Sequence, residues 1–115
     1  MAKNQQLNSA ALSVPFLDEM AEILRVLGHP YRLQIVEYLD LHGPSPVHII
    51  AEGLGGTQGA LSQHLGKMRT AGLLGSERRG KEVWYQIINS DALTILNCVR
   101  TRCAKKKAEK IRSTT

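Results

Sequence analysis

One segment of this chain, residues 57–87, constrains the fold more than any other, because its elements can be predicted in order. Leu61, Leu65, Met68 and Gly72 recur at spacings of four, three and four residues, which is the apolar stripe of an amphipathic helix. Thr57 stands at the N-cap position, where its hydroxyl can accept a hydrogen bond from a free backbone N–H of the first turn. The segment therefore begins with a helix that buries one face and exposes the other.

The exposed face of this helix carries short or amide-bearing side chains instead of the usual mixture of Glu and Lys. A glutamine amide can donate to and accept from the edge of an adenine, and Lys67 can reach a phosphate. Two glycines on this face cost about 1 kcal/mol each relative to alanine, and close approach to another surface would explain them. The alternative is an ordinary surface helix that tolerates its glycines. The predicted DNA contacts of this face are Thr57, Gln58, Gly59, Ser62, Gln63 and Lys67.

A basic hairpin is predicted to follow the helix. Gly72 is a suitable residue to end the helix, and the residues after it are predicted to begin a strand. Alternating apolar residues over 83–87 predict a second strand. Between the strands, Gly80 permits the positive φ of a tight turn. The three cations around it repel one another unless an anion is near, and a DNA backbone or minor groove would supply one. The alternative is a soluble loop whose charge prevents aggregation. The cations, Arg78, Arg79 and Lys81, are therefore predicted DNA contacts.

The rest of the chain predicts further helices and no internal repeat. Their expected bounds are 13–27, 30–41, 47–54 and 91–104, with a turn at 43–46. The fold class is thus mainly α with a small β-hairpin wing, a winged helix-turn-helix.

Apolar stripes on the first and last helices predict contact with another surface. On the first helix one stripe would suffice for a core, so a second stripe suggests another subunit. The two stripes are Phe16, Met20, Ile23 and Leu27, and Leu17, Ala21 and Leu24. On the last helix a coiled-coil-like seam consists of Ala92, Leu96, Val99 and Cys103.

Several motifs resemble those of the arsenic-repressor (ArsR/SmtB) family of winged helix-turn-helix regulators. Residues 28–35, GHPYRLQI, are similar to the start of that family's second helix, and residues 57–65, TQGALSQHL, are similar to its recognition-helix motif. Residues 71–74 and the wing at 79–81 continue the match, which covers about residues 17–103. The resemblance implies a homodimer held through the first and last helices, a repressor-type regulator and a palindromic operator.

The metal sites of this family are altered here. Members that sense metals commonly carry a cysteine pair in the third helix, but the matching positions are Pro46 and His48, and proline cannot ligate a metal. A second family site uses acidic and histidine side chains on the last helix. Two of its four matching positions are cations, which repel a metal; the four are Asn89, Asp91, Arg102 and Lys105. The sequence therefore predicts neither a resident metal nor another cofactor.

Cys98 and Cys103 are the two cysteines, and their spacing of five residues places the thiols about 140° apart on a helix. One alternative is that both have only packing roles. The other is a sensor for an oxidant or a soft metal or metalloid, in which Cys103 on the seam approaches thiols of the second subunit. A regulator without an inducer is a further alternative. His64 is expected to contact the neighbouring helix and not a metal.

The 115 residues suit one domain, with a flexible N-terminus at 1–12, the DNA-binding domain at 13–104 and a basic flexible tail at 105–115. Residues 1–66 contain three Lys/Arg and six Asp/Glu, whereas residues 67–115 contain twelve and four. A segregated basic half indicates a polyanion partner, and double-stranded DNA is the predicted one. No apolar run is long enough to span a membrane and no signal peptide is recognisable, so the chain is expected in the cytoplasm.

Two other functional classes fit the sequence less well. A winged helix used only for protein interaction would need a hydrophobic recognition face, and this one is polar. An enzyme would need a grouping such as Ser/His/Asp, Cys/His or paired carboxylates. Ser62 and His64 face apart on their helix, so the chain is not expected to be an enzyme.

Overall fold

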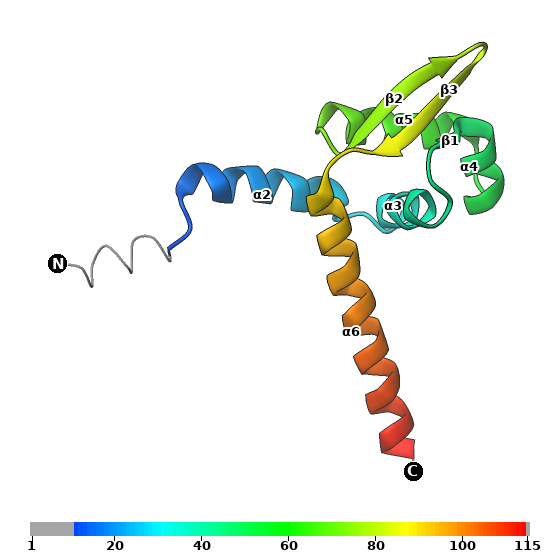
Figure 1. The fold of residues 1–115 in the computed structure, drawn as a ribbon. Helices are drawn as coiled ribbons and strands as arrows, with labels where there is room; N and C mark the ends of the chain where they lie inside the picture. The colour runs from blue at the N-terminus through cyan, green and yellow to red at the C-terminus, as the bar shows by residue number, and fades with distance from the viewer. Residues whose placement is uncertain (1–10, 115) are drawn as a thin grey trace.

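The computed structural model describes residues 11–114, and the side chains of residues 11–112, so most of the predicted flexible N-terminus lies outside the described residues. It confirms a mainly α fold with a small β-sheet (Figure 1). The helices are α2 (Val14–Leu27), α3 (Pro30–His42), α4 (Val47–Leu54), α5 (Gln58–Thr70) and α6 (Ser90–Thr114). The strands are β1 (Ser45–Pro46), β2 (Leu74–Arg79) and β3 (Glu82–Ile87).

One core gathers buried side chains from every described helix and from the start of the hairpin. Of the predicted apolar stripe, Gly72 is exposed beyond the end of α5, whereas Leu61, Leu65 and Met68 are fully buried as predicted. They join Ile35 of α3 and Ile50 of α4 in the same cluster. Burying a side chain such as leucine stabilises the fold by about 1.5–3 kcal/mol relative to leaving it exposed. The opposite face of α5 is consequently the one left to solvent.

Side-chain caps and one glycine set the ends of the helices that the sequence predicted. Ser13 caps α2 and Thr57 caps α5, and each accepts a hydrogen bond from the backbone N–H three residues further on. After α5, Gly72 has a φ of 80°, a left-handed conformation that glycine adopts without strain. The N–H of Leu73 donates to the carbonyl of Met68 at 3.0 Å. The chain therefore turns immediately and enters β2.

The sequence predicted a turn over residues 43–46, and the structure corrects this prediction by placing the short strand β1 inside it. β1 pairs antiparallel with β3, with Ser45 opposite Tyr85 and Pro46 opposite Trp84, in the sheet order β1-β3-β2. So short a strand, with a proline before and within it, shows no alternating pattern. Pro46 has no N–H to donate, which suits a strand at the edge of a sheet.

β2 and β3 form the predicted hairpin. Arg79 pairs with Glu82, so Gly80 and Lys81 alone make the loop. Gly80 has a φ of 64°, and a glycine at the first of two loop positions is typical of a type II′ turn. The hairpin extends beyond the helices, which places the loop at the outer tip of the sheet (Figure 1).

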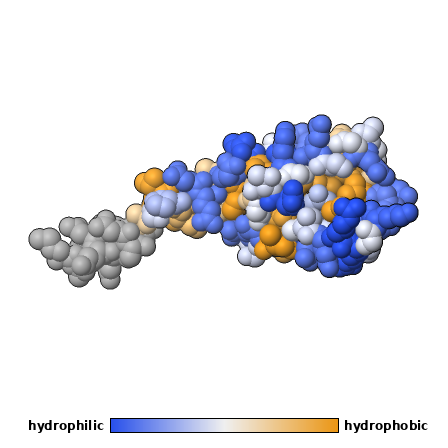
Figure 2. Space-filling model, turned by 90° about the horizontal axis from the view of Figure 1, so that it is seen from above, coloured by the Kyte–Doolittle hydropathy of each residue, from blue (hydrophilic) through white to orange (hydrophobic). Residues whose placement is uncertain are grey.

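α2 packs on the core with only part of its apolar surface. Ile23 and Leu27 are buried, whereas Leu17 and Leu24 of the second stripe are 45% and 53% exposed. Phe16, which shares a stripe with Ile23 and Leu27, is also exposed, because the buried residues of α2 lie towards its C-terminal end. Hydrophobic side chains are visible at the surface of this helix in the space-filling view (Figure 2). α2 thus keeps an uncovered apolar face.

α6 differs from its prediction in two ways. Of the predicted seam, Ala92 and Leu96 are buried in this chain's own core, and only Val99 and Cys103 are exposed. The helix also continues to Thr114, through residues that the sequence assigned to a flexible basic tail. Lys, Ala, Glu and Arg favour the helical conformation, so this part of α6 needs no core contacts to form. It projects away from the sheet and the other helices (Figure 1).

Two glycines provide a matched test of the helix packing. A Cβ added at Gly53 in α4 would clash with Cε2 of the Tyr38 ring, whereas one at Gly59 in α5 would meet nothing within 4 Å. We expect Gly53→Ala to lower the free energy of unfolding by about 1 kcal/mol, because overpacking outweighs the gain in helix propensity. Gly59→Ala should raise it by about 1 kcal/mol. Urea denaturation measures both changes, and shifts of the same sign would contradict the packing around Tyr38.

Candidate nucleic-acid interface

The outer face of α5 presents the predicted recognition residues at the surface. Thr57 is exposed at the N-cap. The predicted residues along the helix are all exposed as well, namely Gln58, Gly59, Ser62, Gln63 and Lys67. A Cβ added at Gly59 or at Gly66 would meet nothing within 4 Å, so the helix backbone is open to close approach on this face. A partner surface can therefore reach amide and hydroxyl groups directly, with no bulky side chain in between.

The wing residues Arg78, Arg79 and Lys81 are exposed at the tip of the hairpin. The sequence predicted an external anion for this charge, but Glu77 already supplies one within the wing, since its Oε2 lies 3.2 Å from Nη2 of Arg79. The guanidinium of Arg79 also lies over Trp84, 4.3 Å from the ring centroid. Arg79 is thus held along the strand, while Arg78 and Lys81 form no ion pair among the described residues.

Hydrogen bonds from Arg32 connect α5 to α2 and α3. Arg32 at the start of α3 donates from Nε to Nδ1 of His64 on α5 and from Nη1 to the carbonyl of Val26 on α2, both at 3.1 Å. The His64 ring also makes edge contacts with the rings of His29 and Tyr31, with centroids 4.6 and 5.2 Å away. The expectation that His64 contacts the neighbouring helix is therefore confirmed.

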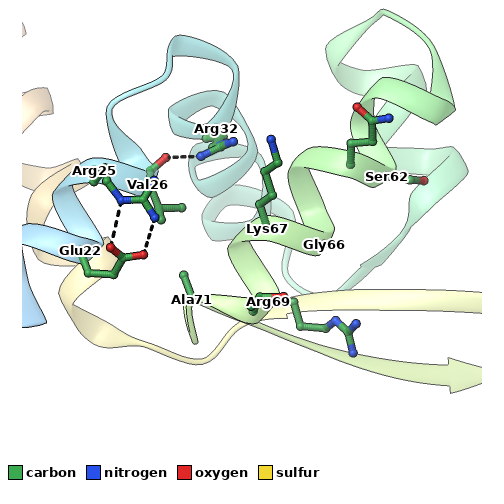
Figure 3. Close-up of a pocket in the computed structure, with 11 residues that line it drawn as sticks. Glu22, Arg25, Val26, Arg32, Ser62, Gly66, Lys67, Arg69 and Ala71 are labelled. Carbon is green, nitrogen blue, oxygen red and sulfur yellow. Dashed lines mark hydrogen bonds and ion pairs between the residues drawn. The ribbon is translucent and has the colours of Figure 1, made fainter.

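A surface cavity of about 650 Å³ lies between the C-terminal half of α2, the start of α3 and the outer face of α5 (Figure 3). Ser62, Gln63 and Lys67 of the recognition face line one side of it. Arg25 and Glu22 line another side, and their ion pair includes a hydrogen bond of 2.9 Å from Nε of Arg25. The cavity is therefore continuous with the predicted DNA-binding face.

No sequence pattern predicted a functional role for Glu22, Arg25 or Arg32. The spacing of Glu22 and Arg25 is typical of an ion pair along one helix. No local pattern shows that this pair lies beside α5, because the cavity joins segments that are far apart in the chain. Arg32 stood out only as part of a family motif.

Cys98 and Cys103 are both exposed on α6. Within residues 11–114, no group of three or more His, Cys, Asp or Glu side chains is placed to hold a metal ion. His48, at a position where metal-sensing relatives commonly have cysteine, faces Glu82 of β3 with Nδ1 4.0 Å from the carboxylate. In the same part of the chain, no helix is long and apolar enough to cross a membrane.

A helix-turn-helix formed by α4 and α5, followed by a β-hairpin with basic residues at its tip, defines a winged helix-turn-helix protein. Residues 29–76 match the arsR family of bacterial regulatory proteins. The biofilm growth-associated repressor of Xylella fastidiosa is 33% identical over 91 residues, which cover 78% of this chain and 79% of that protein. The chain therefore belongs to the arsR family of transcriptional regulators, which are not enzymes.

Solved structures agree with this assignment. The crystal structure of the transcriptional repressor PagR of Bacillus anthracis has 37% sequence identity and a TM-score of 0.67, over 72% of this chain and 94% of that one. The solution structure of the homodimeric winged helix-turn-helix DNA-binding domain Mb0332 from Mycobacterium bovis has 26% identity and a TM-score of 0.69, over 83% and 90%. Both similarities extend over most of the fold.

His64 links the stability of the fold to pH. Burial and the nearby charges of His29, Arg32 and Lys67 lower its pKa below the ordinary 6.5. The neutral ring is favoured in the folded chain, so its contribution to stability is complete above pH 6.5 and is lost as the pH falls through the lowered pKa.

We expect His64→Asn to reduce this acid loss of stability. The amide oxygen of asparagine can still accept a hydrogen bond from Arg32, but the side chain cannot be protonated. Urea denaturation of wild type and variant, from neutral pH to well below 6.5, measures the difference. Unfolding free energies that fall in parallel would contradict the role of His64.

Proposed function

We propose that this chain is a homodimeric, sequence-specific DNA-binding repressor, and that each subunit places α5 in a major groove. The observation that carries the proposal is the division of α5 into two faces. Leu61, Leu65 and Met68 are fully buried, while the outer face presents amide, hydroxyl and backbone groups with one lysine. Those groups can read base edges in a groove that admits a helix. The similar proteins that are named as repressors support repression of transcription as the effect of DNA binding.

The proposed dimer uses the apolar surfaces that one chain leaves uncovered. Leu17 and Leu24 on α2 and Val99 on α6 are each about half exposed. A two-fold symmetric dimer presents two recognition helices, so its operator is palindromic, with half-sites about one helical turn or a little more apart. Because the family is bacterial, we propose that this DNA binding takes place in the cytoplasm.

In the proposed complex the wing contacts the DNA backbone. Arg78 and Lys81 are exposed beside the loop and have no ion pair among the described residues, so they can contact backbone phosphates next to the groove. Arg79 has to share its guanidinium between Glu77 and the DNA. Its contact is therefore weaker than that of an unpaired arginine.

A protein-interaction module is the competing function. Such a module buries an apolar surface on its partner, whereas the exposed residues of α5 from Gln58 to Lys67 are polar or small. The exposed apolar side chains of α2 lie on a different element and are assigned to the dimer.

Two substitutions separate base reading from backbone contact. Gln63→Ala should weaken binding to the cognate duplex and leave binding to a random duplex nearly unchanged, because only a base contact is removed. Arg79→Ala should weaken both about equally and reduce the slope of log affinity against log salt by up to about 1. Fluorescence anisotropy on both duplexes over a salt series measures this, and equal losses for both variants on both duplexes would contradict the division of labour.

Cys98 and Cys103 are the proposed sensing groups if a thiol signal releases the DNA. Both thiols are exposed, and α6 runs without interruption through both positions. Residues five apart on a helix point about 140° apart, so the two thiols cannot form a disulfide within one chain unless α6 unwinds. A thiol signal must therefore act between subunits or with an external thiol or metalloid.

We expect mild oxidation to produce disulfide-linked dimers and no internally bridged monomer. Non-reducing electrophoresis after alkylation of free thiols distinguishes the two products. Cys98→Ser and Cys103→Ser, alone and together, should prevent release of DNA by oxidant or arsenite. Release that is unchanged in the double variant would exclude the thiol sensor. Wild-type DNA binding that neither oxidant nor arsenite weakens would favour the constitutive regulator.

A further inference from the structure

The cavity beside α5 collects positive charge that base reading by the recognition helix does not explain. Its lining includes one carboxylate and four cationic side chains, namely Glu22, Arg25, Arg32, Lys67 and Arg69. Figure 3 shows Lys67 on α5 across from the Glu22–Arg25 pair on α2, with Arg32 between them, while Arg69 extends away along the strands. Three cations from three different helices therefore share one hollow with one competing anion.

Arg32 is held in place before any ligand arrives. Its hydrogen bonds to His64 and Val26 use two of the five N–H groups of the guanidinium and fix its plane. The side chain is half-buried, so its remaining donors have little freedom to turn elsewhere. A positioned guanidinium is well suited to bind phosphate oxygens.

Arg25 is exposed on α2 and is occupied only by its ion pair with Glu22. An exposed pair within one helix contributes little to stability, so an incoming anion can replace the carboxylate at small cost. On the opposite wall, Lys67 extends from the recognition face into the same hollow (Figure 3). Arg25, Arg32 and Lys67 are thus all available to bind the same anion.

We propose that this cavity binds a backbone phosphate of the operator through Arg25, Arg32 and Lys67, so that α2 contacts the DNA together with α5. The inference rests on the proposed function. With α5 in the major groove, the sugar-phosphate backbone beside that groove is the anion nearest to a hollow that adjoins Ser62 and Gln63. α2 also carries the exposed Leu17 and Leu24, so one helix would join the DNA backbone to the second subunit.

The test compares Arg25→Gln with Arg102→Gln by anisotropy over a salt series. Arg102 is an exposed arginine on α6 that also pairs with a glutamate, Glu109, at 3.9 Å, so its loss removes the same charge far from the cavity. The probes are a duplex that the wild type selects from a random library and a scrambled duplex.

We expect Arg25→Gln to weaken binding to both duplexes about fivefold at physiological salt and to reduce the salt slope by about 0.9, the value for one phosphate contact. Arg102→Gln should leave the slope unchanged. Glu22→Gln should strengthen binding, because it releases Arg25 and removes the competing carboxylate. A folding defect cannot produce this gain.

Equal slopes for Arg25→Gln and Arg102→Gln would overturn the proposal. A second outcome would also overturn it. Inorganic phosphate at constant ionic strength would displace DNA from the wild type but not from Arg25→Gln, while both proteins keep the same salt slope. The cavity would then bind a free anion and not the DNA backbone. If the wild type selects no sequence, the proposed function fails. The slopes on the scrambled duplex would still decide the phosphate contact.

Discussion

The one-sided burial of α5 is the constraint on which the rest of the structure depends. Leu61, Leu65 and Met68 have no exposed surface, so the rotation of this helix about its axis is set by the core. The same rotation decides that Gln63 and Lys67 face outward. Because the chain turns at Gly72 directly after α5, the hairpin is placed relative to the helix with no flexible linker in between. The groups proposed to read bases and the charges of the wing are therefore held in one rigid arrangement.

A second constraint connects this arrangement to the rest of the chain. Arg32 bonds to α2 through the Val26 carbonyl and to α5 through His64, so one side chain ties three helices together. α2 is also the helix with the largest uncovered apolar face, which a second subunit would cover. A shift of α2 when that face is covered can be transmitted to α5 through the guanidinium of Arg32. This physical route would couple a signal at the dimer surface to DNA binding.

Features that depend on local pattern were predictable from the sequence, and features that depend on distant partners were not. The caps at Ser13 and Thr57 and the glycine loop of the wing follow from residues next to one another, and all are present. Strand β1 exists because Ser45 meets Tyr85, a partner forty residues away. The cavity beside α5 was missed for the same reason, since its cations come from three helices. The solvent-exposed face of α5 was predictable because it lies opposite one periodic apolar stripe.

The most direct measurement is fluorescence anisotropy on duplexes tiled from the DNA upstream of this protein's own gene, with a random duplex as control, at physiological salt and with reductant present. We expect tight, saturable binding to one tile, with two subunits bound per duplex and a site of two-fold symmetry. Weak binding of equal strength to every tile and to the random duplex would contradict it. In that case the outer face of α5 would not read sequence on these duplexes.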